Sequence, residues 1–379
     1  MHSEHLVTVE KLAVGGDGVA RIPIKDRTMV VFVSKAAPQD ELKIKISVVE
    51  KTFLRAEIVE IIKPSPARRE APCEYFSACG GCVWQHINED EQLRQKELIL
   101  TELFKKFIPE VNYALAKGVA SPKNLHYRNR IQLKRLGAKL GYFKKESHDI
   151  VDINYCLIAD KLVSDQIPII KEKLKPAAEL QKYELKLNHK NEFEYYRIGE
   201  SGEGLSFSQV NNEINQLLVE LVTKLVADKN PSFLTELYAG AGNFTFDLLK
   251  NLNSLRIESV EMNPELTKFS TKKLSELSLQ KRLFAFTSDC ESFASRRALS
   301  NEFILLDPPR AGCSDSVLKK VIEAGSKDII YISCHPVFLA RDLQKIFAAN
   351  KNYKIRHLQI FDMFPQTDHF ETFVHLSTT

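Results

Sequence analysis

Near the C-terminal end of the chain, a cysteine stands where a nucleophile would be useful. The apolar run 328–333 has the pattern of a buried strand, and Cys334 follows it directly. Pro336 suits the first turn of a helix, which places the cysteine between a strand end and a helix N-terminus. The partial positive charge there favours thiolate over thiol. A cysteine within a strand is usually an inert core residue, but Cys334 lies just past the strand, and we expect a nucleophile.

A thiolate suits the methylation of carbon 5 of uracil. Carbon 5 is a poor nucleophile, and addition of a thiolate at carbon 6 makes it enolate-like, so that it can attack a sulfonium methyl group. The adduct keeps the proton of carbon 5, and a base must remove it before the cysteine leaves. Glu371, which follows the strand-to-loop passage 361–367, is the candidate base. Its spacing alone marks only an acid in a terminal strand.

A glycine turn further upstream could bind a cofactor. The strand 233–238 runs into this turn, where Gly240 and Gly242 permit a close backbone approach to a ligand. The turn alone leaves the ligand open, because the dinucleotide fingerprint needs a third glycine where Phe246 stands. Glu261 ends the next strand and could accept hydrogen bonds from both hydroxyls of a ribose, or be an exposed loop acid.

A rigid acidic turn, Asp307-Pro308-Pro309-Arg310, follows the strand 303–306. Two prolines cannot continue a strand, so they hold Asp307 at the mouth of the sheet. Similar turns occur in enzymes that methylate exocyclic amines, and this motif leaves the target atom open. Asp289, after the strand between those of Glu261 and Asp307, is a candidate for contact with an adenine.

The elements that position these residues alternate from about residue 205 onward. Helix-length segments separate apolar strands at 233–238, 256–260, 303–306 and 328–332. This alternation predicts a doubly wound parallel sheet with helices on both faces. Ligands of such sheets bind at the carboxyl ends of the strands, where the motifs fall.

Together these motifs resemble those of the RNA uracil-5-methyltransferases. The resemblance covers nearly the whole chain, and GDGVAR (16–21) and RAEIVEI (55–61) resemble that family's TRAM RNA-binding domain. The matching C-terminal segments occur in the family's order: FSQVNN (207–212), ELYAGAGNF (236–244), LDPPRAGC (306–313), YISCHP (331–336) and DMFPQTDHFE (362–371).

The resemblance implies an α/β, Rossmann-like S-adenosylmethionine methyltransferase domain with Cys334 as nucleophile and Glu371 as proton acceptor. Ala239 is one departure, because the family often has cysteine there, but the turn geometry should survive. The positions that match the family's S-adenosylmethionine contacts are Gln209, Tyr238, Asn243, Glu261 and Asp307.

Cysteine usage indicates a reducing compartment. The chain has seven cysteines, an odd number, and no signal-peptide pattern at its start, so we expect a cytoplasmic protein without a disulfide framework. The stretch from Cys73 to His86 resembles the family's iron–sulfur segment. The resemblance implies a [4Fe–4S] cluster held by Cys73, Cys79, Cys82 and Cys156. Spacing by itself would also permit zinc, and a radical enzyme with an open iron is a further alternative, which a fourth cysteine disfavours.

Three domains are expected. Residues 1–63, rich in β-branched residues, predict a TRAM-like β-barrel of the oligonucleotide-binding type. Residues 64–200 begin with a linker at 64–69, include an amphipathic helix at 91–107, and form a small α+β iron–sulfur and RNA-binding domain. Residues 201–379 form the methyltransferase domain.

RNA is the expected partner. The net charge of +4 is too small to identify a nucleic-acid binder, but residues 121–145 hold eight Lys or Arg and no Asp or Glu. Tyr127, Tyr142 and Phe143 interleave with these cations, which suits phosphate contacts and base stacking as well as a solvated face, and Arg128 and Arg130 are candidate phosphate contacts.

The substrate implied is a uridine of 23S ribosomal RNA, with transfer RNA as the alternative. Amine methylation and a non-catalytic RNA-binding role are the competing function classes. No apolar run suggests a membrane span, and we expect a monomer.

Overall fold

A computed structural model of the chain describes residues 4–24, 27–199, 209–279 and 281–378. Packing divides it into two units. Unit 1 comprises Met1–Ile99, Lys123–Glu200 and Phe364–Asp368, and unit 2 comprises Leu100–Pro122, Ser201–Met363 and His369–Thr379. The expected division into three domains stays a prediction, because packing groups the first two parts in one unit.

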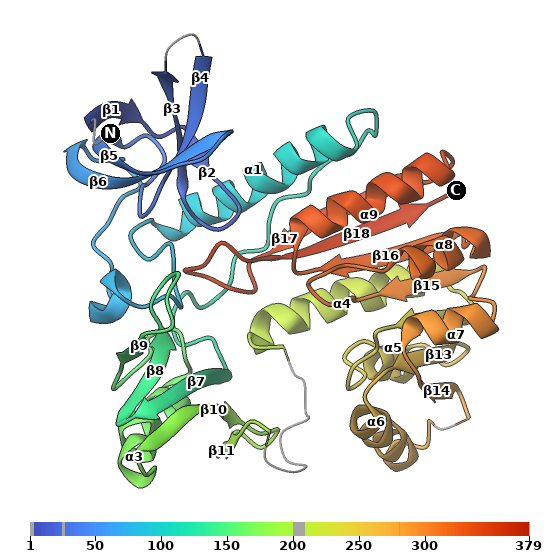
Figure 1. The fold of residues 1–379 in the computed structure, drawn as a ribbon. Helices are drawn as coiled ribbons and strands as arrows, with labels where there is room; N and C mark the ends of the chain where they lie inside the picture. Colours follow the sequence, from blue (N-terminus) through green and yellow to red (C-terminus); the bar gives the residue numbers. More distant parts are fainter. Residues whose placement is uncertain (1–3, 25–26, 200–208, 280, 379) are drawn as a thin grey trace. The chain divides into compact units, whose positions relative to one another are not determined.

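The N-terminal part of unit 1 is a six-stranded sheet around its own apolar core (Figure 1). One face of each strand enters the core through alternate residues such as Val31 and Ile44, both fully buried. The sheet order is β1-β5-β6-β4-β3-β2. Its strands are β1 (Glu4–Thr8), β2 (Lys11–Leu12), β3 (Gly18–Ile24), β4 (Arg27–Val33), β5 (Glu41–Val49) and β6 (Phe53–Lys63).

The stretch expected to be a linker is anchored rather than loose. Asp40 is fully buried and accepts hydrogen bonds from the backbone amide of Ser65 at 2.8 Å and from Nε of Arg68 at 3.0 Å. These bonds, with the guanidinium of Arg68, hold the pKa of Asp40 below its usual value although burial alone would raise it. The buried ion pair therefore ties residues 65–68 to the N-terminal sheet.

The rest of unit 1 builds a five-stranded antiparallel sheet, ordered β11-β10-β7-β8-β9, with its own core. Helix α1 begins in unit 1 and ends in unit 2. The elements are η1 (Glu74–Ser77), α1 (Glu89–Phe107), β7 (Arg130–Gly137), β8 (Lys139–Phe143), β9 (Ile150–Asp152), α2 (Lys161–Ser164), α3 (Gln166–Lys173), β10 (Ala177–Leu187) and β11 (Phe193–Arg197).

Unit 2 confirms the predicted Rossmann-like α/β fold. Its seven-stranded sheet has the order β14-β13-β12-β15-β16-β18-β17, and only β18 runs antiparallel to its neighbours. The elements are α4 (Asn212–Lys229), β12 (Phe233–Leu237), α5 (Thr245–Asn251), β13 (Arg256–Glu261), α6 (Pro264–Glu276), β14 (Leu283–Thr287), α7 (Cys290–Arg296), β15 (Phe303–Leu306), α8 (Asp315–Ala324), β16 (Asp328–Ser333), α9 (Pro336–Ala349), β17 (Lys354–Phe361) and β18 (Glu371–Ser377). Among the described helices, none combines the length and apolar character needed to span a membrane.

Candidate active site

Cys334 lies at the carboxyl end of β16, as predicted, and is partly buried. Pro336 opens α9 two residues later, and the amide of His335 donates to Oγ of Ser333 at 3.2 Å. Burial, with the nearby acids Glu371 and Asp307, raises the pKa of Cys334 to about 12. The expectation that the helix N-terminus would favour a thiolate is therefore wrong for the free protein. Removal of the thiol from water outweighs the helix dipole, and the sulfur is a neutral thiol.

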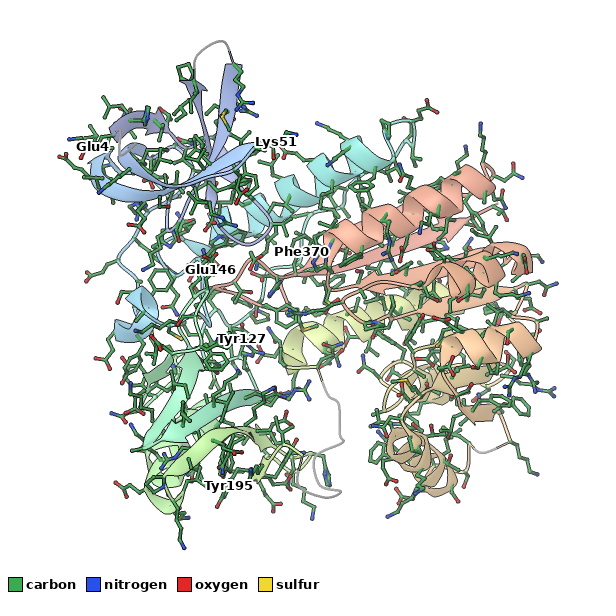
Figure 2. All side chains as sticks on the ribbon, in the orientation of Figure 1. Glu4, Lys51, Tyr127, Glu146, Tyr195 and Phe370 are labelled. Carbon is green, nitrogen blue, oxygen red and sulfur yellow. The ribbon has the colours of Figure 1, made fainter. Side chains whose placement is uncertain are left out.

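Glu371 stands beside the cysteine because of strand register. Ser333 pairs with Thr372 across β16 and β18, which places Cys334 and Glu371 at neighbouring strand ends. Glu371 is buried, its neighbour Phe370 is fully buried (Figure 2), and its Oε2 has no hydrogen-bond partner. Burial and then Asp307 raise the pKa of Glu371 well above its usual value. Burial therefore favours the protonated form of this carboxyl group.

Asp307 completes the acidic group at the mouth of the sheet. It directly follows β15, the strand that pairs with β16, and burial raises its pKa to about 7. Arg310, three residues later, lowers the pKa of both Cys334 and Glu371. One cation thus acts on two of the three acidic groups. No sequence pattern assigned a role to Arg310, because its effect depends on the folding of the turn.

The turn that carries Asp307 and Arg310 is tied to α9. Asp342, fully buried in that helix, accepts hydrogen bonds from the amide of Cys313 at 2.9 Å and from the hydroxyl of Tyr331 at 2.6 Å. Gly312 has a φ of +75°, and a Cβ there would lie 2.6 Å from Oδ2 of Asp342. Glycine is therefore required at this position, and Asp342 is a supporting residue that the sequence patterns did not reveal.

The glycine turn after β12 is built around Glu261. The carboxylate of Glu261 accepts hydrogen bonds from the amide of Gly240 at 2.9 Å and from that of Asn263 at 2.7 Å. A carboxylate has further lone pairs, so these bonds leave room for ribose hydroxyls. Gly242 has a φ of +87°, and a Cβ there would lie 2.6 Å from the ring of Phe246, which packs where the fingerprint would have glycine.

Two other residues that are predicted to contact the cofactor, Tyr238 and Asn243, adjoin this turn in the chain. Asn243 exchanges two hydrogen bonds of 2.9 Å with Asn215 of α4, and Tyr238 precedes the turn with a φ of +64°. Gln209 is described, whereas Phe207 and Ser208 of the same motif lie outside the described residues. Asp289 caps α7 by accepting from the amide of Ser292 at 2.8 Å.

Sequence reasoning also missed a buried acid beneath this site. Glu236 in β12 is 2% exposed and accepts a hydrogen bond from Oγ1 of Thr245. Burial, with Asp307 nearby, raises its pKa to about 8. A strand position gives no such signal, because a glutamate there normally faces solvent.

In unit 1, the four cysteines singled out in the sequence line one small cavity of about 50 Å³. Burial, with a smaller contribution from the neighbouring thiols, raises the pKa of Cys79 to about 11 and that of Cys82 to about 12. Arg128 also lines this cavity, and its Nε has no hydrogen-bond partner. The described residues contain no group of three or more His, Cys, Asp or Glu side chains arranged around a single metal ion.

The basic segment 121–145 is only partly exposed: Lys123, Lys139, Lys144 and Lys145 are exposed, whereas Arg135 is buried. Tyr127 is in the core and donates to the carbonyl of Pro365 at 3.0 Å (Figure 2). Arg128 and Tyr142 line the cysteine cavity, and burial lowers the pKa of Arg130. The prediction that Arg128 and Arg130 contact RNA phosphates stays a prediction, because both side chains are partly exposed. The pattern of cations and aromatics could not distinguish an exposed face from the wall of a cavity.

Family models match both ends of the chain. Residues 182–379 match the family described as tRNA (uracil-5-)-methyltransferase, and residues 3–59 match the TRAM domain. The N-terminal sheet therefore has the predicted identity of an RNA-binding module.

Individual proteins are similar over almost the full length. A protein named uncharacterized RNA methyltransferase from Bdellovibrio bacteriovorus is 41% identical, covering 98% of this chain and 94% of the relative. The tRNA (uracil(54)-C(5))-methyltransferase of Schizosaccharomyces pombe is 27% identical, covering 98% of this chain and 77% of its own. The crystal structure of a Pyrococcus abyssi tRNA (uracil-54, C5)-methyltransferase, in complex with S-adenosyl-L-homocysteine, has the same fold. The two structures have a TM-score of 0.71 and a sequence identity of 22%. The alignment covers 99% of this chain and 100% of that one.

Proposed function

The chain belongs to the tRNA (uracil-5-)-methyltransferase family, and from this premise we propose that it methylates carbon 5 of a uridine in RNA through a covalent adduct with Cys334. The observation that carries this mechanism is the pairing of Cys334 and Glu371 at neighbouring strand ends, with Asp307 and Arg310 beside them. A thiol next to a buried carboxyl group, at the ligand-binding edge of a Rossmann-like sheet, suits addition to carbon 6 and proton removal at carbon 5.

Bond formation and proton transfer balance in this mechanism. The target uridine leaves its stack, because both faces of the ring must be reachable. Sγ of Cys334 releases its proton to water and bonds to carbon 6, and the C5–C6 double bond becomes an enolate. Carbon 5 of this enolate then takes the methyl group as the bond between methyl and the sulfonium sulfur breaks. Glu371 then removes the proton of carbon 5, directly or through a water, and the bond between sulfur and carbon 6 breaks.

The buried acids explain why the groups act in turn. In the free protein burial raises the pKa of both Cys334 and Glu371 and so favours their neutral forms, and Arg310 only partly opposes this. Formation of the sulfur–carbon bond removes one potential negative charge from the site. Glu371 can then ionise beside Arg310 and act as a base at the step where a base is needed.

The residues around the glycine turn fit S-adenosylmethionine as methyl donor. This cofactor supplies a methyl group activated by a sulfonium. Glu261 is held by two backbone amides with lone pairs left for a ribose, and a Cβ at Gly240 would meet no atom within 4 Å. Gln209, Tyr238, Asn243 and Asp307 are the further residues that we assign to its binding.

We also propose that Cys73, Cys79, Cys82 and Cys156 hold a [4Fe–4S] cluster. All four line one cavity, and the unpartnered Nε of Arg128 gives that cavity a cationic donor suited to an anionic group. A cluster binds each thiolate to a different iron, so its ligands are spread more widely than those of one zinc ion.

Two RNAs are candidates for the substrate. The combination of a TRAM domain with four cysteines favours 23S ribosomal RNA. The relatives from Schizosaccharomyces pombe and Pyrococcus abyssi carry names that specify uridine 54 of transfer RNA. Mapping 5-methyluridine separately in ribosomal and transfer RNA, with and without the gene, decides between them.

The test of the mechanism compares two variants on the RNA so identified. Cys334→Ala should abolish methyl transfer while S-adenosylmethionine still binds, because the thiol is not part of the cofactor pocket. Glu371→Gln should still transfer the methyl group but stall at proton removal, so that a methylated RNA–protein adduct survives denaturation. Full activity of Cys334→Ala would refute the covalent mechanism and favour amine methylation. No methyl transfer by the unmodified enzyme would favour a role in RNA binding alone.

A further inference from the structure

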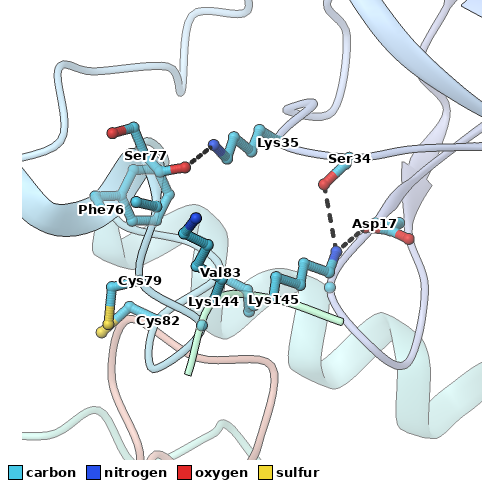
Figure 3. A pocket seen from close by; sticks show the side chains of 13 residues that line it. Asp17, Ser34, Lys35, Phe76, Ser77, Cys79, Cys82, Val83, Lys144 and Lys145 are labelled. Atoms are coloured by element: carbon cyan, nitrogen blue, oxygen red, sulfur yellow. Dashed lines mark hydrogen bonds and ion pairs between the residues drawn. The ribbon is translucent and has the colours of Figure 1, made fainter. Parts of the chain in front are cut away.

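A second cavity of unit 1, of about 310 Å³, is lined in part by residues 76–80, 82 and 83 of the cysteine loop, the stretch from Cys73 to His86, including Cys79 and Cys82. Its volume is within the range of small-molecule sites, about 300–1,000 Å³. Three lysines, Lys35, Lys144 and Lys145, line it together with one acid, Asp17, and one aromatic ring, Phe76 (Figure 3). We call it the lysine pocket. The lysines come from two separate loops, one after β4 and one after β8.

The charges of the lysine pocket favour an anion. Asp17 is already neutralised, because its carboxylate lies 2.6 Å from Nζ of Lys145 and 3.1 Å from the guanidinium of Arg55. Nζ of Lys35 donates to the carbonyl of Ser77 at 2.6 Å, a bond that leaves its charge uncompensated. Lys144 has a weak, exposed pair with Asp149 at 3.3 Å, which water screens.

The strained backbone of Lys35 also indicates a binding site. Its φ is +58°, a left-handed conformation that a lysine rarely adopts. Such strain persists where the surrounding structure holds it, and it is frequent at ligand clamps. Here the bond from Nζ of Lys35 to Ser77, across the pocket wall, holds the side chain at the cavity (Figure 3).

The aromatic ring adds a stacking surface. Phe76 is partly exposed and packs against His86 with ring centroids 5.5 Å apart, while Nζ of Lys35 lies 6.0 Å from its centroid. Ammonium groups beside an aromatic ring are the mixture that single-stranded nucleic acids require, phosphate neutralisation together with base stacking.

We propose that the lysine pocket binds one nucleotide of a single-stranded RNA segment, a nucleotide other than the uridine that is methylated. Lys35 and Lys144 hold its phosphate, and the base lies on Phe76. The inference rests on the proposed function, because the bound nucleotide belongs to the RNA that the enzyme methylates. Lys144 belongs to the basic segment 121–145, so the inference narrows the RNA-binding face expected from the sequence to the exposed end of that segment together with Lys35.

The test uses the full-length protein and a labelled short oligouridylate as probe. The double variant Lys35→Ala/Lys144→Ala should bind it about tenfold more weakly, and the slope of log affinity against log salt should fall by about 0.7 for each phosphate that the variant no longer neutralises. The matched control is Lys63→Ala/Lys173→Ala, which removes the same charge from exposed positions of unit 1 that do not line the pocket. Equal affinity and equal slope in the two double variants would overturn the proposal.

A footprinting experiment on the unmodified protein gives a result that does not depend on whether the variants fold. Acetylation of the unmodified protein, read by mass spectrometry, should show Lys35 and Lys144 protected by the oligouridylate and Lys63 and Lys173 unprotected. Protection of Lys35 and Lys144 by uridine monophosphate or inorganic phosphate at the same concentration would identify a small-anion site and overturn the assignment to an RNA strand. Phe76 also lines the cysteine cavity, so the lysines carry the test.

Failure of this inference differs from failure of the proposed function. Methyl transfer to RNA by the unmodified enzyme, with no protection of Lys35 and Lys144, would support the proposed function and contradict RNA binding in the lysine pocket. Protection of both lysines without any methyl transfer would support RNA binding in the lysine pocket and contradict the proposed function.

Discussion

At the scale of single residues, burial sets the chemistry of the active site more than the helix dipole does. Cys334, Glu371 and Asp307 all have pKa values raised by burial, and Arg310 opposes the shift at two of them. The sequence placed the first three correctly at strand ends. It could not reveal their protonation, because the extent of burial depends on side chains from other elements.

The pKa of about 7 at Asp307 leads to a prediction for cofactor binding. Its folded-state pKa is raised, so the group is neutral at lower pH and becomes an anion as pH increases through about 7. An anion attracts the sulfonium of S-adenosylmethionine, and affinity should therefore rise by about tenfold, or ~1.4 kcal/mol, between about pH 6 and about pH 8.

Titration calorimetry at several pH values measures this dependence. S-adenosylhomocysteine, whose sulfur is neutral, is the matched ligand and should show a much smaller change. Asp307→Asn should bind S-adenosylmethionine with little pH dependence across this range. The same increase in the variant as in the unmodified protein would assign the titration to another group.

At the scale of elements, local patterns predicted more of unit 2 than of unit 1. The strands of a parallel sheet are buried on both faces and stand out as apolar runs, so β12, β13, β15 and β16 were located within about two residues. Strand β3 was not predicted, because Gly18 and Pro23 interrupt its pattern. A Cβ at Gly18 would lie 2.7 Å from Cβ of Ala36, a long-range reason for glycine that no local pattern contains.

The loop Phe364–Asp368 depends entirely on long-range contacts. Gln366 is fully buried with a φ of +70°. Its side-chain oxygen accepts from Nε2 of Gln92 at 3.0 Å, and its carbonyl accepts from the amides of Val83 and Trp84, both at 3.1 Å. The cysteine loop, through the residues that follow Cys82, therefore helps to hold a segment that lies five residues before Glu371 in the chain.

We expect Gln366→Ala to make this loop more mobile. Glu371, the proposed base, follows the loop in the chain and should then be less well positioned. Buried donors and acceptors would be left unpaired, which lowers the free energy of unfolding by about 1–3 kcal/mol. With Glu371 less well placed, proton removal should slow more than methyl transfer. The methylated RNA adduct should then accumulate, as it does in the prediction for Glu371→Gln.

The matched control is Gln95→Ala, another fully buried glutamine of unit 1, which accepts from the amide of Leu12 at 2.8 Å and does not contact the loop. Denaturant unfolding and gel analysis of denatured reaction mixtures measure the two effects. Loss of stability in both variants with no excess adduct in Gln366→Ala would show that the loop does not position the base.

At the scale of the whole molecule, packing separates the cysteine cavity from the methyl-transfer site. The four cysteines lie in unit 1 and the residues around the glycine turn lie in unit 2, each with its own core. The family resemblance implied a common ligand for the four cysteines, and the fold shows that Cys156, far along the chain from Cys82, lines the same cavity. The arrangement predicts that the two sites can be disabled separately.

Cys82→Ala tests this separation. We expect anaerobically purified protein to contain about four irons with sulfide and to be brown, and the variant to lose iron and sulfide and to unfold more easily. S-adenosylmethionine should still bind the variant with unchanged affinity, because unit 2 has its own core. Cys290→Ala is the matched control, since Cys290 is a buried cysteine of unit 2 outside the cavity, and it should keep the iron. Metal and sulfide analysis with calorimetry of cofactor binding measures both effects. One zinc and no sulfide in the unmodified protein would contradict the cluster, whereas loss of cofactor binding in Cys82→Ala would contradict the independence of the two units.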